Sequence, residues 1–391
     1  MITCFLAPGR EKLALNHHPW VFSGALVRWS GTPEAGEVVR VCASDGRFIA
    51  LGQFNPGSKI RLRLLEWNES ASVDSAWYAA RLDEALALRR PLERETDVLR
   101  LVFAEADGLP GLIVDKVGDW LVVQFLTAGA DRLKPVWTQL LSDKVPGLKG
   151  IVEKSDGDGR KMEGLEESHG VLWGQAPPAW VRVHENGALF DVEVGAQKTG
   201  FYSDQRDNRF LVSQVASGAR VLDAFCYTGG FAVHAMRAKA SSVVLADASS
   251  DALIAAKHNL EINGFTPERL VEGDAFTTLR ELKKAGERFG LVVLDPPKLA
   301  PTRESVDRAL RGYKDLNLQA LALVERGGWL ASFSCSGAVD EKTFQDVVAF
   351  AAKDAGRTVQ VVRRFSQAPC HPVRTSMPES FYLKGLLARV L

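Results

Sequence analysis

The region after residue 219 constrains the fold most strongly, because short apolar strands alternate there with helices. The expected strands lie at residues 220–222, 242–246, 269–271, 291–294 and 329–333, and the expected helices at about 230–239, 250–263, 277–287, 305–325 and 340–355. This alternation predicts an α/β fold, a doubly wound parallel sheet covered on both faces. Residues 359–365 and 381–390 have no helix between them, so we expect a terminal antiparallel pair.

The first half of the chain has a different pattern. Residues 1–69 contain short β segments, including the alternation of basic and apolar residues from Lys59 to Leu64, which predicts a small β-barrel or sheet domain. Residues 70–185 mix strands with helices and form a predicted central α/β domain, in which residues 156–178 are expected to be loop. The strand–helix alternation then falls in a third domain, residues 186–391.

Composition excludes several classes of protein. The chain has 391 residues, and its 48 Lys and Arg balance its 48 Asp and Glu, so a bulk positive field gives no argument for nucleic acid. No apolar run approaches the roughly 18 residues that span a bilayer. The start of the chain does not resemble a secretory signal. Five scattered cysteines suggest neither a metal site nor a disulfide framework, so we expect a cytoplasmic protein with reduced thiols and no membrane or metal partner.

Four successive strands of the third domain end on or just before an acid. These acids are Asp223, Asp247, Asp274 and Asp295. Ligands of open α/β sheets bind outside the carboxyl ends of the strands, so four acids there suit a cationic ligand with hydroxyls and amines. S-adenosyl-L-methionine has these properties, with Asp247 expected at the ribose hydroxyls and Asp274 at the adenine amine. The alternative is that the acids only cap the following helices.

Two loops are the other expected contacts of this cofactor. The loop after the first strand is not the G-x-G-x-x-G of a dinucleotide site, but its adjacent glycines permit close backbone approach. The predicted cofactor-binding residues of this loop are Phe225, Tyr227, Thr228 and Gly229. Upstream, a segment with aromatic residues is expected to cover the cofactor, through Lys198, Thr199, Gly200 and Phe201.

Asp295-Pro296-Pro297-Lys298 follows the fourth strand directly. The prolines stiffen the backbone and donate no amide hydrogens, so nearby carbonyls can face outward and accept from a planar base. Lys298 stands where amino-methyltransferases usually carry a stacking aromatic, which weakens an amino-methylation interpretation. The pair can also be only a stiff turn.

Cys335 follows the fifth strand in Phe333-Ser334-Cys335-Ser336-Gly337. C5 of cytosine is a poor nucleophile, and a thiolate that adds to C6 turns C5 into an enamine carbon able to attack a sulfonium methyl. The position of Cys335 at a strand end favours this role, although a lone cysteine is more often a small buried hydrophobe. Arg206 and Arg209 are candidates to face RNA phosphate, or else belong to a solvated helix start.

Taken together, these motifs resemble the ribosomal RNA large-subunit methyltransferase I family, the 23S rRNA cytosine-C5 methyltransferases. The resemblance covers essentially the whole chain. It is carried by Lys198–Phe201 with Asp204–Arg206, Asp223–Gly230, Asp295–Lys298, Arg311-Gly312-Tyr313-Lys314-Asp315, Phe333–Gly337, and the ending His371-Pro372, Pro378-Glu379 and Tyr382–Gly385. His18–Gly24 resembles the start of the family's PUA domain, an RNA-binding β-barrel, and Ala106–Gly111 marks its central domain.

The resemblance implies a class I methyltransferase domain with S-adenosyl-L-methionine as cofactor and 23S rRNA, or a large-subunit precursor, as partner. It implies that Cys335 adds to the base, that Asp295 with Pro296 and Pro297 holds it, and that Tyr313 and Lys314 lie near the RNA. The group that removes the C5 proton is open between Asp295, Lys298 and water. A homodimer is suggested by the resemblance alone. Methylation of another base, such as guanine N7, and a non-catalytic RNA-binding assembly factor remain the alternatives.

Overall fold

The computed structural model describes residues 1–195, 200–300 and 302–391. The chain forms two compact units, and each is built from separate stretches of sequence. The first unit comprises Met1–Val183, Val192–Ser203 and Pro369–Ser380; the second comprises His184–Asp191, Asp204–Ala368 and Phe381–Leu391. The finer division into domains at residues 69/70 and 185/186 stays a prediction.

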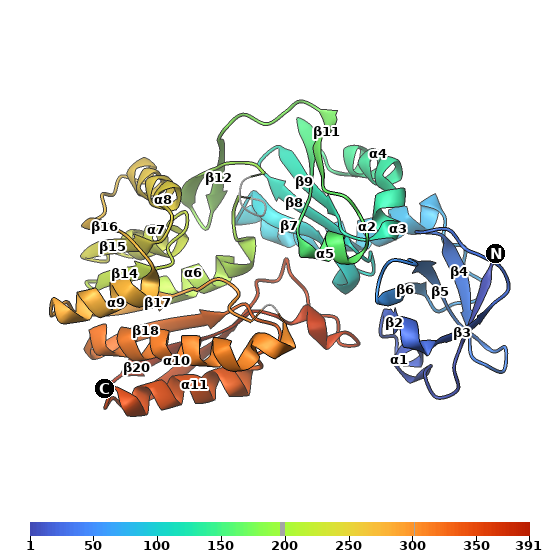
Figure 1. The fold of residues 1–391 in the computed structure, drawn as a ribbon. Coiled ribbons are helices and arrows are strands. Elements are labelled where there is room, and N and C mark those ends of the chain that lie inside the picture. The colour runs from blue at the N-terminus through green and yellow to red at the C-terminus, as the bar shows by residue number, and fades with distance from the viewer. Residues whose placement is uncertain (196–199, 301) are drawn as a thin grey trace. The chain divides into compact units, whose positions relative to one another are not determined.

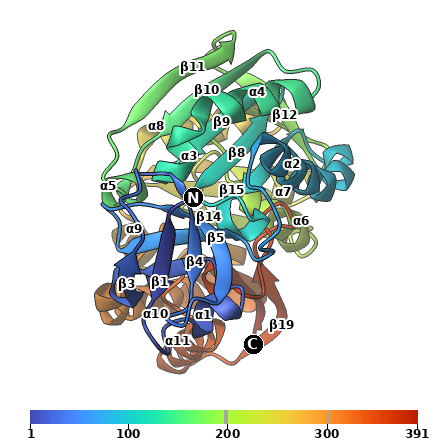
Figure 2. The ribbon, with the colours of Figure 1, turned by 90° about the vertical axis from the view of Figure 1, so that its right-hand side faces the viewer.

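The first unit begins with the expected small β domain. Its six-stranded sheet has the order β2-β6-β5-β4-β1-β3, and Figure 2 shows β1, β4 and β5 side by side. The strands are β1 (Thr3–Leu6), β2 (Trp20–Phe22), β3 (Leu26–Trp29), β4 (Val38–Cys42), β5 (Phe48–Phe54) and β6 (Ile60–Glu66), with the short helix α1 (Lys12–Leu15). The period-2 alternation in β6 buries Leu62 and Leu64 in the core of this domain, as half-buried strands require.

A second sheet of the first unit has five strands in the order β11-β10-β9-β8-β7. These are β7 (Val98–Phe103), β8 (Leu112–Val117), β9 (Trp120–Phe125), β10 (Gly150–Ser155) and β11 (Ser168–Gly174), accompanied by the helices α2 (Ser75–Arg89), α3 (Ala128–Arg132), α4 (Lys134–Lys144) and α5 (Asp158–Met162). The expected loop over residues 156–178 is wrong, because α5 and β11 lie within it. β11 pairs antiparallel with β10 at the sheet edge and is largely exposed, so it lacks the buried apolar alternation that identifies most strands.

The second unit contains the predicted doubly wound sheet. Its seven strands have the order β16-β15-β14-β17-β18-β20-β19. They are β14 (Arg220–Ala224), β15 (Ser242–Asp247), β16 (Arg269–Glu272), β17 (Phe289–Leu294), β18 (Val324–Ser334), β19 (Val359–Ser366) and β20 (Lys384–Val390). β14–β18 run parallel, whereas β20 is antiparallel to both β18 and β19, which confirms the terminal antiparallel pair. The division between the units falls in the hairpin of β12 (Val181–Glu185) and β13 (Ala188–Val192).

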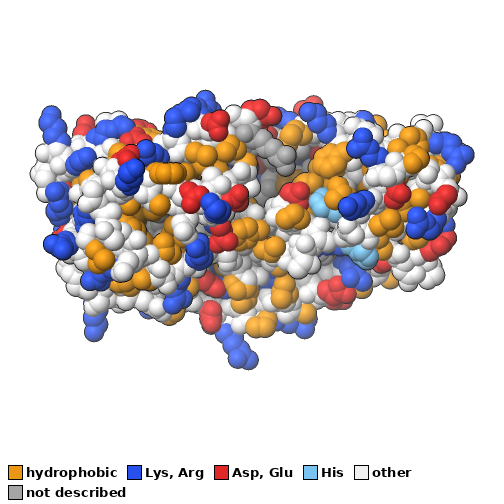
Figure 3. Space-filling view, turned by 90° about the horizontal axis from the view of Figure 1, so that it is seen from below, with side chains coloured by type: hydrophobic (Ala, Val, Ile, Leu, Met, Phe, Trp, Pro, Cys, Tyr) orange, Lys and Arg blue, Asp and Glu red, His pale blue; other side chains and the backbone are white. Residues whose placement is uncertain are grey.

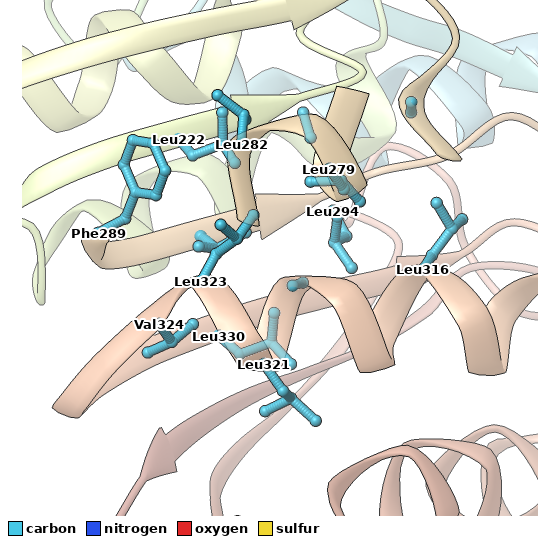
Figure 4. Packing of buried hydrophobic residues seen from close by; sticks show 14 of the residues in the cluster. Leu222, Leu279, Leu282, Phe289, Leu294, Leu316, Leu321, Leu323, Val324 and Leu330 are labelled. Atoms are coloured by element: carbon cyan, nitrogen blue, oxygen red, sulfur yellow. The ribbon is translucent and has the colours of Figure 1, made fainter. Parts of the chain in front are cut away.

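Helices cover both faces of the seven-stranded sheet (Figure 1). They are α6 (Arg206–Ser213), α7 (Gly230–Arg237), α8 (Ser250–Ile262), α9 (Ala275–Lys284), α10 (Val306–Leu323) and α11 (Glu341–Asp354). The sticks of Figure 4 show Leu279 of α9 and Leu316 of α10 packed with Leu294 of β17 in one apolar core. On the other face, the Phe231 ring of α7 lies 5.3 Å from that of Phe333.

On the face shown in Figure 3, Lys and Arg side chains are scattered among Asp and Glu rather than gathered into one large patch. No helix within the described residues combines the length and apolar character that crossing a bilayer requires.

Candidate functional site

The candidate site lies where the strand order of the second sheet reverses, between β14 and β17. Ala224 and Leu294 are register partners at the carboxyl ends of these strands, so the loops that follow start side by side. In open α/β sheets this crevice is the usual ligand site. Asp223 is the last residue but one of β14, and Asp295 directly follows β17.

Asp223 is the most perturbed acid of the site. Its side chain is almost completely buried, and Oδ2 accepts a 3.0 Å hydrogen bond from the Ala232 amide of α7. Oδ1 is buried and has no hydrogen-bond partner among the described residues. Burial, and to a smaller extent the negative charges of Asp295 and Asp247, raise the pKa of Asp223 to about 8. A buried carboxyl beside two other acids is the environment in which a cationic ligand is favoured.

The other two strand-end acids hold backbone amides. Asp247 accepts 3.0 Å hydrogen bonds from the amides of Tyr227 and Ser249. Asp274 is exposed and caps α9 through the Thr277 amide at 3.2 Å. The helix-capping alternative is therefore realised at Asp274, and in part at Asp223, while contacts of either acid with a cofactor stay predictions.

The loop between β14 and α7 has an unusual backbone. Phe225 and Tyr227 have positive φ values of 63° and 46°, and Gly229 follows with φ 79°. Left-handed conformation costs a residue with a side chain on the order of 1 kcal/mol and persists where surrounding contacts fix it. Here Asp247 holds the Tyr227 amide, and Asn259 donates a 3.0 Å hydrogen bond to the Thr228 carbonyl. Such enforced strain is typical of ligand-binding loops.

These residues fit S-adenosyl-L-methionine. The buried, unpartnered Oδ1 of Asp223 is an acceptor that an ammonium group would satisfy, and the neighbouring carboxylates favour a positive charge. The loop between β14 and α7 offers no phosphate cradle of the dinucleotide type, in keeping with a cofactor that has no phosphate.

A second group of residues surrounds the segment after β17. Asp295 Oδ1 accepts a 2.9 Å hydrogen bond from Gln205 Nε2, and Asn208 donates a 2.6 Å hydrogen bond to Gln205 Oε1. The Gln205 amide is thus held at both ends. Pro296 is buried, whereas Pro297 and Lys298 are exposed. The carbonyl of Pro296 lies 3.9 Å from Cys335 Sγ, so the two sequence motifs meet in space.

Cys335 alone among the five cysteines is not buried, and all five lie within the described residues. Its neighbours Ser334 and Ser336 are completely buried, and the hydroxyls of both lie 2.9 Å from the Tyr313 hydroxyl. Anchoring the residues on both sides of the cysteine fixes its backbone while its thiol stays accessible. Burial raises the pKa of Cys226 well above the ordinary thiol value, which opposes a nucleophilic role there.

Lys384, the first residue of β20, lies in the Tyr382–Gly385 motif, but the sequence predicted no site role for it. Its side chain is 2% exposed, and its Nζ donates 2.7 Å hydrogen bonds to the carbonyls of Ser336 and Val339. Burial lowers the pKa of Lys384 to about 8, although the neighbouring Cys335 opposes this shift. A lysine at the head of a mostly apolar strand was the available signal. Gln205 lies in the Asp204–Arg206 motif of the resemblance, but its uniformly polar surroundings indicated no particular role for it.

Two predicted RNA contacts are corrected by the structure. Arg209 is buried, and its Nε donates a 2.7 Å hydrogen bond to Glu185 Oε1. Its guanidinium therefore forms an ion pair inside the second unit and does not face phosphate. Arg206 is also buried, with its Nε 2.8 Å from Asp207, and is not presented to RNA either. The prediction that these two arginines face phosphate is therefore wrong.

Tyr313 is likewise buried and anchors the cysteine loop, so a direct RNA contact of its side chain is contradicted. Lys314 pairs with Asp354 and is partly exposed, and its role stays a prediction. Lys198 and Thr199 lie outside the described residues. Gly200 and Phe201 are buried parts of the first unit, and their role at the cofactor stays a prediction.

Comparison with known proteins identifies the family of this chain and similar folds. Residues 5–67 match the family described as PUA-like domain, and residues 166–376 match S-adenosylmethionine-dependent methyltransferase. The chain is 41% identical, over 100% of both chains, to ribosomal RNA large subunit methyltransferase I of Aliivibrio fischeri, and 44% identical to that of Shewanella amazonensis over 98% of both. A solved structure of SMU.776 in complex with SAH has the same fold, with a TM-score of 0.86 at 19% identity over 100% of both chains. The chain therefore belongs to the ribosomal RNA large subunit methyltransferase I family, whose members are S-adenosylmethionine-dependent methyltransferases.

Proposed function

We propose that this protein methylates C5 of a cytosine in large-subunit ribosomal RNA, with Cys335 as the nucleophile that adds to C6. The rRNA substrate is supported by the names of the relatives that are 41–44% identical over nearly the whole chain. The choice of cytosine rests on a single observation. An accessible cysteine stands at the end of β18, with its Sγ 3.9 Å from the Pro296 carbonyl beside Asp295.

The reaction needs an enzyme nucleophile because C5, as part of the aromatic cytosine ring, is too weak a nucleophile to attack the methyl group unaided. The Cys335 thiolate forms an S–C6 bond, and C5 becomes an enamine carbon. When bound, S-adenosyl-L-methionine would supply an electrophilic methyl group, with S-adenosyl-L-homocysteine as the leaving group. After C5 has been methylated, its proton passes to a base, the C5–C6 double bond re-forms and the S–C6 bond breaks, which regenerates Cys335.

The remaining residues orient the base and the thiol. The Asp295 carboxylate, held by Gln205, and the Pro296 carbonyl are acceptors for the exocyclic amine of cytosine. The base has to leave its stack to reach them, as for other enzymes that act on a nucleobase. Asp295, Lys298 or water takes the C5 proton. We also propose that the protein forms a homodimer. Sedimentation velocity measures the oligomeric state and tests this independently of the reaction.

The decisive experiment is methyl transfer from labelled S-adenosyl-L-methionine to unmodified 23S rRNA, followed by nucleoside mass analysis. The wild type is expected to form 5-methylcytidine, and Cys335→Ala is expected to lose this activity while it still binds the cofactor. The matched control, Cys42→Ala, removes a buried thiol of the first unit and should methylate normally. Full cytosine methylation by Cys335→Ala would refute the covalent mechanism.

Two other outcomes would redirect the proposal. A different product, such as 7-methylguanosine, formed regardless of Cys335 would keep the cofactor and the fold but change the target base. Absence of cofactor binding in calorimetry would point to an RNA-binding assembly factor without turnover. The buried Asp223 oxygen, which has no hydrogen-bond partner among the described residues, supports cofactor binding.

A further inference from the structure

We propose that Lys384 is a positioning residue for Cys335: its buried ammonium group fixes the loop that carries the cysteine and stabilises the thiolate form. This inference rests on the proposed nucleophilic role of Cys335. It concerns a residue on a different strand, 49 positions further along the chain.

The strand register brings the two residues together. Ser334 is the register partner of Lys384 in the antiparallel pair β18–β20, so Cys335 starts its loop directly beside the lysine. Lys384 is also the partner of Ser366 in β19, which places it on an interior strand of the sheet. Gly385 follows it and lies against the Phe333 ring, where an added Cβ would come within 2.3 Å of the ring. The head of β20 is therefore closely packed against the end of β18.

The hydrogen bonds of Lys384 close the cysteine loop. Its Nζ donates to the carbonyls of Ser336 and Val339, both at 2.7 Å, and these residues lie one and four positions after Cys335. Burying a lysine is costly unless its charge is compensated. Two carbonyls satisfy hydrogen bonds but carry no net charge, so a buried ammonium group at this place favours an anion close by. The adjacent thiol is a group that can become one.

The charged groups around Lys384 agree with this assignment. Cys335, Asp340 and Glu341 favour its protonated form, and Lys298 opposes it. Because burial brings the pKa of Lys384 down to about 8, the ammonium form predominates below that pH. Through the same interaction, that charge lowers the pKa of the Cys335 thiol and raises the thiolate fraction at neutral pH.

The test measures thiol reactivity, which does not require methylation. Iodoacetamide alkylation of Cys335 is followed by peptide mass analysis between about pH 6 and pH 10 in wild type, Lys384→Met and Lys384→Arg. In wild type we expect the thiol to titrate below its ordinary pKa of about 8.5. Lys384→Met should raise this pKa by about one unit and slow alkylation near pH 7 about tenfold, whereas Lys384→Arg should keep most of the reactivity.

Controls separate this role from a merely structural one. Lys342→Met removes an exposed lysine of α11 that pairs with Asp346, and its alkylation profile should match wild type. If folded Lys384→Met has the wild-type profile, the proposal is wrong. If that variant fails to fold, a wild-type thiol that titrates at or above about 8.5 overturns the proposal just as well. If the alkylation profile of Lys384→Met is shifted but wild type forms no 5-methylcytidine, Lys384 activates the thiol and the proposed methylation reaction is wrong.

Discussion

The Asp295 carboxylate accepts a 2.9 Å hydrogen bond from the side-chain amide of Gln205. Asn208 holds the other end of that amide, and Asn208 in turn donates a 2.9 Å hydrogen bond to the Ser366 carbonyl of β19. The acid therefore has a fixed orientation that originates in α6 and the sheet edge. This chain of contacts makes Gln205 a positioning residue for the proposed base-binding acid.

Gln205→Leu should slow methyl transfer while the protein stays folded, because Asp295 loses the hydrogen bond from Gln205 Nε2. Hydrogen bonds to charged groups contribute about 1.5–3 kcal/mol, which corresponds to a fall of about 10- to 100-fold in kcat/KM. Steady-state kinetics with 23S rRNA measures the effect. The control Gln214→Leu changes an exposed glutamine just after α6 and should leave the rate unaltered. Equal rates for both variants would remove Gln205 from the site.

Asp223→Asn should stabilise the cofactor-free protein at alkaline pH and weaken cofactor binding. The pKa of Asp223 is raised from 3.8 to about 8 by burial, so its ionisation destabilises the folded state as pH rises above about 4, and the full cost is present above about pH 8. Urea unfolding should show little difference between the variant and wild type near pH 4. Above pH 8 the variant should gain at least about 1 kcal/mol, the equivalent of one pKa unit.

The same variant should bind S-adenosyl-L-methionine at least about tenfold more weakly in calorimetry, because a neutral amide replaces the acid. Asp251→Asn, at an exposed position in the first turn of α8, should follow the wild-type pH dependence and affinity. If the free energy of unfolding of Asp223→Asn differed from that of wild type by the same amount at every pH, the raised pKa of Asp223 would be contradicted.

Arg209→Met should destabilise the protein by about 3–5 kcal/mol, because it leaves the buried Glu185 charge without its main partner. Burial alone would raise the pKa of Glu185, but Arg209 and His234 outweigh it and lower this pKa to about 2. The stabilisation is therefore present above the unfolded value of about 4.5, and it is lost as pH falls from there towards 2. Urea unfolding at neutral and acid pH measures both effects.

The double variant Glu185→Gln/Arg209→Met serves as the control for this ion pair. It removes the buried charge together with its partner and should recover part of the stability lost by Arg209→Met. An Arg209→Met protein with wild-type stability and weakened RNA binding would instead support a phosphate contact.

Gly385→Ala should cost about 1–3 kcal/mol of stability, as overpacking in a core does. The added Cβ would lie 2.3 Å from the Phe333 ring, and Phe333 is completely buried and cannot move aside without cost. Gly159→Ala in α5 is the matched control, since nothing lies within 4 Å of its added Cβ. Denaturant midpoints of the two variants should differ clearly, and equal midpoints would refute the close packing of β18 and β20.

Local sequence patterns predicted the seven-stranded sheet and the acids at its strand ends, because buried parallel strands are short, apolar and flanked by helices. They did not predict β11, an exposed edge strand with glycine at positions 170 and 174. Arg209 was misjudged because a charged side chain near a helix start looks solvated in sequence. Its partner Glu185 lies 24 residues earlier, and only tertiary structure joins the two.

Long-range register also explains why no role beside Cys335 was predicted for Lys384, although its motif carries the family resemblance. Its place beside Cys335 depends on the pairing of β18 with β20, which aligns residues about 50 positions apart. By contrast, the proximity of Pro296 and Cys335 could be anticipated, because both follow adjacent parallel strands at the same edge.

The interleaved paths of the two units limit how this protein can be dissected. Residues 184–191 belong to the second unit although the first unit resumes at residue 192, and the first unit takes up the chain once more at residues 369–380. A truncation at residue 185 would deprive the first unit of two of its own segments, and no single proteolytic cut would release either unit intact. A fusion protein that contains the second unit also has to include the segments of the first unit that interrupt it in sequence. This architecture can therefore be transferred only as the entire chain.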